Sequence, residues 1–146
     1  MTARFRVIED ISLADAAFEA SGDSPSELCQ AAAQALIETL ADPATVSPSW
    51  SHRVSLRAID LSDLLFDWLS ELVYLKDAEA VVFREVSPLV VEGRPGSEWS
   101  LAATVTGARI DPARQELRAD VKAVTKHLYE VKQDGVQWVA RVVLDI

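Results

Sequence analysis

The sequence predicts an α+β domain of two layers, in which two helices pack on one large, mostly antiparallel β-sheet. Two segments, near residues 24–42 and 61–75, carry apolar residues at helical spacing. Apolar residues alternate with polar ones in the segments 47–58 and 138–145, which is the period of a half-buried strand, and the pattern is strand-like from Asp77 to the end. The C-terminal part reads as a hairpin, because Asp134-Gly135 separates two alternating runs and glycine accepts the positive φ of a type I′ turn. The length predicts a single domain over residues 1–146.

The N-terminal half is expected to contain three strands, at residues 5–10, 15–21 and 47–58. Ser24 as N-cap, followed by Pro25 and by Glu27 to complete a capping box, predicts the start of the first helix. Asp42-Pro43 predicts its end, because the residue before a proline is pushed out of the helical conformation.

The second helix is expected to run from about Leu61 to Leu75, with a wide apolar stripe of leucines around Trp68. This stripe predicts that Trp68 is core, and that Lys76 and the acidic residues of the helix point away from the core. Five strands are expected after it, at residues 80–86, 89–92, 99–106, 120–131 and 136–145. The longest irregular segment is Gly107–Arg118, which contains three arginines and is predicted to be a loop.

The composition excludes several classes of function. The net charge of −9 argues against nonspecific binding of nucleic acid, so any RNA would be reached through another protein, whereas cation binding or docking on a basic partner is compatible with it. No apolar run approaches the roughly 20 residues of a membrane span. The N-terminus does not resemble a signal peptide, and the single cysteine, Cys29, cannot form an internal disulfide and is expected to be packed. A cytoplasmic protein is therefore expected.

The candidate site consists of acidic groups near the ends of strands. Asp145 interrupts the apolar pattern at the end of the chain, and the α-carboxylate of Ile146 is expected beside it. Together they would place two hard oxygen ligands at the C-terminus. Asp15 stands in an apolar context where the first strand has turned into the second. Spacing alone does not tell whether Asp15 and Asp145 meet in space.

Other chemistry-bearing residues favour simpler interpretations. The chain has no phosphate-binding loop, no nucleophile elbow and no zinc-protease motif, and two histidines with one cysteine do not make the usual structural zinc site. His52 is expected to be solvated on a strand. His127 is expected to be hydrogen-bonded at the edge of the core, with a role as ligand or base as the alternative.

Four segments resemble the archease family of small proteins that activate the RtcB-type tRNA-splicing RNA ligase. The two specific ones are the stretch 120–127, with Lys122, Thr125 and His127, and the terminal Val142-Val143-Leu144-Asp145-Ile146. The other two are Leu13-Ala14-Asp15, followed by Gly22 and the capped helix, and the leucine-rich stretch 63–72. The resemblance extends over the whole chain.

The resemblance implies a divalent cation, usually calcium, held by Asp15, Asp145 and the main-chain carboxylate of Ile146. Ligation by oxygen alone suits Ca²⁺ or Mg²⁺ better than zinc, with calcium as the first expectation. The family lysine falls on Lys122, which would offer a charge to a phosphate or carboxylate of the ligase or its nucleotide. This sequence departs from four motifs of the family. The family's His-Thr is replaced by Ile11-Ser12-Leu13, and its Trp-Gly-Glu by Thr106-Gly107-Ala108. Its Arg-His is replaced by Arg114-Gln115, and its Thr-Tyr-His by Thr125-Lys126-His127.

The function implied by the resemblance is that of a metal-binding accessory protein without catalytic activity of its own. It would promote GTP-dependent guanylylation and multiple turnover of the RNA ligase in tRNA splicing, and would meet RNA only through the ligase. Two alternatives remain. A metal-dependent hydrolase would use His127 or Lys122 beside the cation. A chaperone-like binding module would bind unfolded clients without regard to the metal.

Overall fold

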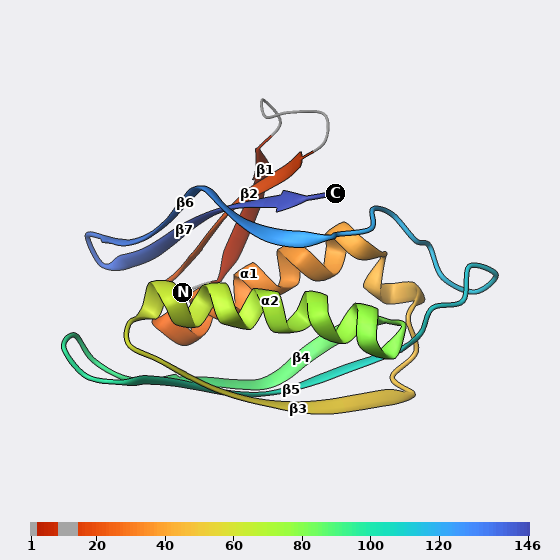
Figure 1. Cartoon of the computed structure of the whole chain (residues 1–146), viewed down its shortest axis with the longest axis horizontal. Coiled ribbons are helices and arrows are strands. Elements are labelled where there is room, and N and C mark those ends of the chain that lie inside the picture. The colour runs from red at the N-terminus through yellow and green to blue at the C-terminus, as the bar shows by residue number, and fades with distance from the viewer. Residues whose placement is uncertain (1–2, 9–14) are drawn as a thin grey trace.

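The computed structural model describes residues 3–8 and 15–146, which form two antiparallel sheets with two helices between them (Figure 1). Each helix contacts strands of both sheets. The α+β class, the two helices and the antiparallel pairing are therefore as predicted. The described strands form two sheets, however, and not the single large sheet expected from the sequence.

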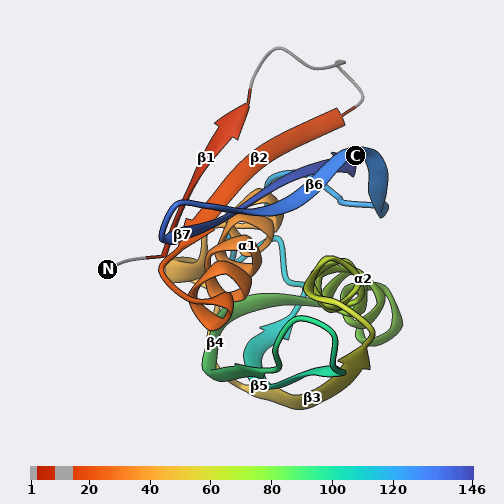
Figure 2. The same cartoon turned by 90° about the vertical axis from the view of Figure 1, so that its left-hand side faces the viewer.

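The four-stranded sheet joins the two ends of the chain. Its strands lie in the order β1 (Arg4–Ile8), β2 (Asp15–Gly22), β7 (Gln137–Asp145) and β6 (Ala123–Asp134), with each neighbour antiparallel. The C-terminal strand β7 is thus a central strand, paired on both sides. Figure 2 shows this sheet on one side of α1, with the C-terminus near the start of β2.

The three-stranded sheet covers the other side of the helices. Its order is β3 (Trp50–Ala58), β5 (Trp99–Arg109) and β4 (Val81–Glu92). β4 is one long strand where two short strands were predicted, and its pairing with β5 is irregular between Val86 and Leu89. A proline at position 88 explains the interruption in the sequence pattern, because proline has no N–H to give to the ladder.

The first helix, α1 (Pro25–Leu40), starts as the sequence predicts and is followed by a short 3₁₀ turn, η1 (Pro43–Thr45). The backbone N–H of Glu27 donates to Ser24 Oγ at 3.1 Å, and Glu27 Oε1 accepts from the N–H of Asp23 at 2.9 Å. α2 (Leu61–Glu79) is four residues longer than predicted and ends at Ala80, which has a φ of 52°. Neither of these helices is long and apolar enough to cross a lipid bilayer.

A second sheet is present because the helices bury more than one face. Four alanines and the larger apolar residues of α1 are buried around much of its circumference, so one sheet does not cover them all. Trp68 of α2 is fully buried at the centre, as expected, and its indole N–H donates to the carbonyl of Cys29 at 3.1 Å. Cys29 is fully buried, which confirms the prediction of a packed cysteine, and this burial raises the pKa of its thiol to about 12.

The C-terminal hairpin is confirmed, but its turn differs from the predicted type. Asp134 pairs with Gln137, so the two central residues of the turn are Gly135 and Val136. Gly135 has a φ of 64°, whereas Val136 is not among the residues with positive φ. Positive φ at the first central position alone is typical of type II′, which places glycine first for this reason.

We expect the substitution Gly107→Ala to lower the free energy of unfolding by about 1–3 kcal/mol through overpacking. Gly107 lies inside β5, and a Cβ added there would come within 2.1 Å of the carbonyl oxygen of Val82 on β4. The backbones of the two strands would have to separate at that point. Urea denaturation measures the loss, with Ala102→Ser at an exposed position of the same strand as the control. Equal midpoints for the two variants would contradict the prediction.

Candidate metal centre

Asp15 and Asp145 lie directly opposite each other in the antiparallel pair of β2 and β7. Asp15 is the first residue of β2 and Asp145 the last of β7, so the two meet at one end of the four-stranded sheet. Side chains of directly opposed residues lie on the same face, with Cβ atoms about 4.5–5.5 Å apart. The tertiary structure thus brings together two residues that are separated by nearly the whole chain.

The two aspartates occupy the outer face of this sheet, away from the helices. Phe18 and Ala20 of β2, with Val142 and Leu144 of β7, belong to the core. Because side chains alternate between the faces of a strand, Asp15 and Asp145 point to the opposite side. Both are partly buried, and their neighbours on the same face, Ala17 and Val143, are only 2% and 1% exposed.

Neither carboxylate has a hydrogen bond or ion pair with another residue of the described part of the chain. Like charges placed directly opposite each other on a sheet are destabilising. A cation bound between them makes the electrostatic energy of the pair favourable. The next charged pair along the strands, Glu19 opposite Arg141, combines opposite charges across the sheet. Among the described residues, Asp15 and Asp145 therefore form the unpaired acidic end of this face.

The chain end is held beside these carboxylates. The side chain of Ile146 packs against the core, and the main-chain carbonyl of Asp145 accepts a hydrogen bond of 2.7 Å from the N–H of Lys122. On the β6 side, Asp145 faces Ala123, whose small side chain leaves room next to the carboxylate. The backbone position of the last two residues is thus set by contacts from both sides.

Lys122 reaches this place through a loop that is fastened to the helices. The N–H groups of Arg118 and Ala119 donate to the carbonyls of Leu40 and Thr39 at 2.9 and 3.0 Å. Further along, the carboxylate of Asp120 forms an ion pair with Lys76 of α2. These contacts therefore fix the loop 110–122 just before Lys122, whose N–H donates to Asp145.

Lys76 corrects a prediction, because it is buried and does not point into solvent. Its side chain is only 4% exposed and also lies 2.7 Å from Asp77. Burial by itself lowers the pKa of this lysine, but hydrogen bonds and charge from Asp120 and Asp77 outweigh it and hold the pKa above its ordinary value. Helical periodicity places Lys76 next to the apolar stripe. Lys76 is buried because the loop 110–122 lies over it, which the periodicity does not predict.

The donor set at this end of the sheet fits a hard divalent cation. Carboxylate and main-chain oxygens are the ligands that Ca²⁺ and Mg²⁺ take. Within the described residues no three His, Cys, Asp or Glu side chains come together in a metal-binding group. Two carboxylates are therefore the full side-chain contribution from this part of the chain, and further ligands must be main-chain oxygens, water or groups of a partner.

The remaining predicted residues lie away from any such cluster. Lys122 is exposed, and its contact with Asp145 is through the backbone. His52 is exposed, as predicted, and its ring stacks on Trp50. His127 is exposed in the irregular part of β6, so the prediction of a histidine hydrogen-bonded at the edge of the core is wrong. Within the described residues it is only its backbone N–H that forms a hydrogen bond, to Thr125 Oγ1 at 3.3 Å. The substituted segment 11–13 lies outside the described residues.

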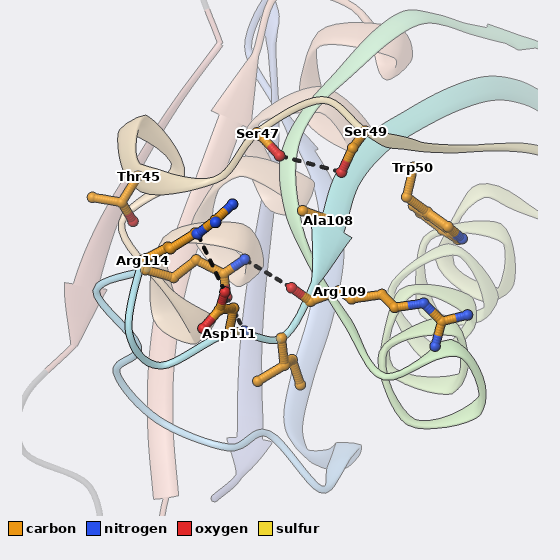
Figure 3. A pocket seen from close by; sticks show the side chains of 10 residues that line it. Thr45, Ser47, Ser49, Trp50, Ala108, Arg109, Asp111 and Arg114 are labelled. Carbon is orange, nitrogen blue, oxygen red and sulfur yellow. Dashed lines mark hydrogen bonds and ion pairs between the residues drawn. The ribbon is translucent and has the colours of Figure 1, made fainter.

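The sequence did not predict a second feature, a pocket on another part of the surface. A pocket opens between the loop after η1, the start of β3 and the end of β5 (Figure 3). Its walls include Trp50, Arg109 and Arg114. The three arginines of the predicted loop were the available signal, but the partner segment lies some 60 residues earlier in the chain and no spacing rule connects the two.

Comparison with known proteins identifies the family. The family model of the archease protein family matches residues 5–146. The chain is 34% identical over 133 residues to the protein archease of Methanosarcina barkeri, which covers 91% of this chain and 90% of that protein. It is 32% identical over 135 residues to the protein archease of Pyrococcus abyssi, covering 91% and 93%.

Solved structures agree with the fold. The solution structure of protein 1598 of Methanobacterium thermoautotrophicum has a TM-score of 0.80 and 30% identity, and the match covers 97% of this chain and 98% of that one. The crystal structure of an archease and possible chaperone from Thermotoga maritima has a TM-score of 0.61 at 22% identity, with the same coverage, and supports the fold. The resemblance first seen in the terminal motifs is thus confirmed over nearly the whole sequence, and the chain belongs to the archease protein family.

Proposed function

We propose that this archease is a cation-dependent accessory protein that activates a tRNA-splicing RNA ligase. Asp15, Asp145 and the α-carboxylate of Ile146 would hold the cation, with calcium as the expected ion. The protein would carry out no catalysis of its own. It would act by promoting guanylylation of the ligase with GTP and its repeated turnover.

The observation that carries the proposal is the pairing of two unneutralised carboxylates at the end of β2 and β7. A structural role would favour a salt bridge or a hydrogen bond at this position, because facing like charges destabilise a sheet. No described residue supplies one. Membership of the archease family supports a protein partner, since the archease of Thermotoga maritima is described as a possible chaperone.

The charge of the chain suits a partner with a basic or metal-containing surface. At −9 the protein is attracted to such a surface over several ångströms. A cation held by only three protein groups keeps positions for oxygen ligands from water or from the partner. Docking would then occur at the end of the four-stranded sheet where Asp15 and Asp145 lie.

Multiple-turnover ligation in the presence of GTP tests the proposal. One molecule of archease for every ten of ligase is added, and the number of ligations per ligase is counted. We expect several turnovers per ligase with the wild type and with Asp134→Asn, which removes an exposed carboxylate at the far end of β6. Asp145→Asn should leave the ligase near one turnover. Equal ligation with and without archease would reject the proposal.

The same proteins separate the alternatives. A chaperone-like module would suppress aggregation of unrelated unfolded proteins, and Asp145→Asn would do so as well as the wild type. A hydrolase would consume a phosphate ester substrate without any ligase present. Activation of the ligase that depends on Asp145, without either of these activities, distinguishes the proposed function from both.

We expect Lys122→Ala to spare cation affinity and to lower activation of the ligase. Its side chain is exposed and its link to Asp145 uses the backbone N–H, which alanine keeps. The lost group is a charge available to a phosphate or carboxylate of the partner. Calcium titration and the turnover assay measure the two effects, with Lys132→Ala further along β6 as the control. Activation equal to that of the control would assign Lys122 to a merely solvated position.

A further inference from the structure

The pocket between the loop after η1 and the end of β5 has the size of a small-molecule site. Its volume is about 560 Å³, within the range of roughly 300–1,000 Å³ found for ligand pockets. It lies on different elements from the proposed metal centre: the last residue of η1, the loop 46–49, the first residue of β3, the last two residues of β5 and the loop 110–115. Nothing proposed above for the metal centre uses these residues.

Two guanidinium groups give this pocket a positive charge in an otherwise acidic protein. Arg109 has no side-chain hydrogen bond or ion pair with any residue of the described chain. Arg114 lies 3.6 Å from Asp111, whose other carboxylate oxygen accepts from the N–H of Ala113 at 3.1 Å. One carboxylate against two guanidinium groups leaves one positive charge, and Arg109 is available to bind an anion.

The remaining walls combine hydroxyl groups with a flat aromatic ring. The hydroxyl groups of Ser47 and Ser49 are hydrogen-bonded to each other at 3.2 Å, so one of the two O–H groups remains free to donate to a ligand. The ring of Trp50 stacks on His52 with centroids 5.8 Å apart and planes at 5°, which orients the indole. Figure 3 shows Arg114 on one side of Ala108, and Trp50 with Arg109 on the other.

We propose that this pocket binds a mononucleotide. The phosphate would be held by Arg109, which lies on the same side of Ala108 as Trp50, because the planar fork of a guanidinium matches two phosphate oxygens. The base would lie against Trp50, since the face of any base stacks on an aromatic ring. The serine hydroxyls would contact the sugar or the phosphate. The inference goes beyond the accessory role proposed above and does not depend on it.

Calorimetric titration of the isolated protein tests the site without ligase or divalent cation. The probes are AMP, adenosine and inorganic phosphate. We expect AMP to bind more tightly than either fragment, because it alone engages both Arg109 and the ring. Arg109→Gln should weaken AMP binding by about tenfold or more, the loss of a hydrogen bond to a charged group. Trp50→Leu should weaken AMP binding and leave the affinity for phosphate unchanged.

Arg94→Gln is the matched control, because it makes the same change of charge in the turn between β4 and β5, at the other end of β5. Arg109 and Arg94 are both exposed, so neither substitution disturbs the core, and equal melting temperatures verify this. AMP binding that is no weaker in Arg109→Gln than in Arg94→Gln would overturn the proposal. Inorganic phosphate that binds as tightly as AMP would overturn it too, since the ring would then contribute nothing.

Discussion

Replacing Asp15 or Asp145 by alanine is expected to abolish the stabilisation of this archease by calcium while leaving its fold intact. A ligand that binds only the folded state adds about 2.7 kcal/mol at a hundredfold excess over its Kd. For a chain of this length that corresponds to a rise in Tm of roughly 5–10 °C. Either substitution removes one of the two carboxylates that face each other across β2 and β7, and no other described side chain takes its place.

The direction in which each substitution changes the stability without calcium makes this prediction specific. With chelator present, each alanine variant should be as stable as the wild type or slightly more stable, because the repulsion between opposed carboxylates is gone. A purely structural aspartate would behave in the opposite way and lose stability under both conditions. Differential scanning calorimetry with calcium and with chelator separates the two cases. Asp134→Ala, in the exposed part of the same hairpin, is the control. Equal calcium-induced shifts in all variants would exclude Asp15 and Asp145 as ligands.

Adding a single residue after Ile146 is expected to weaken calcium binding and activation of the ligase. The extension moves the terminal charge by one Cα step, about 3.8 Å, and puts a neutral amide carbonyl in its former place. Calcium–oxygen bonds of roughly 2.3–2.6 Å do not absorb that shift. The end of the strand cannot shift to bring the displaced charge back to the cation. The side chain of Ile146 packs against the core, and the main-chain carbonyl of Asp145 accepts a hydrogen bond from the N–H of Lys122.

Calorimetric titration of two glycine-extended proteins measures the effect. One protein carries the added glycine after Ile146 and the other carries it before Met1. We expect weaker calcium binding only in the first, and unchanged melting of both in chelator. Equal calcium affinity of the two proteins would show that the α-carboxylate of Ile146 is not a ligand, and would leave Asp15 and Asp145 to be tested by their own substitutions.

Most of the elements, apart from the undivided β4 and the last turn of α2, were predictable from the sequence because their signals are local. Ser24, Pro25 and Glu27 define the start of α1 within four residues, and Asp134-Gly135 marks the final hairpin. Alternation along β7 also identified which of its residues face the core, and therefore that Asp145 does not. Such patterns depend on the geometry of one helix or strand, which the chain specifies residue by residue. The terminal motifs also indicate the family, because each is a short run of contiguous residues.

Contacts between distant segments were decided only by the tertiary structure. The facing of Asp15 and Asp145 requires β2 and β7 to pair in one register, which is set by their apolar faces packing on the helices. The division into two sheets follows from helices that need cover on two sides, and the burial of Lys76 follows from the loop that ends at Asp120. The pocket around Arg109 likewise joins two loops that are distant in sequence. Local periodicity carries no information on such encounters, because they depend on how whole elements pack.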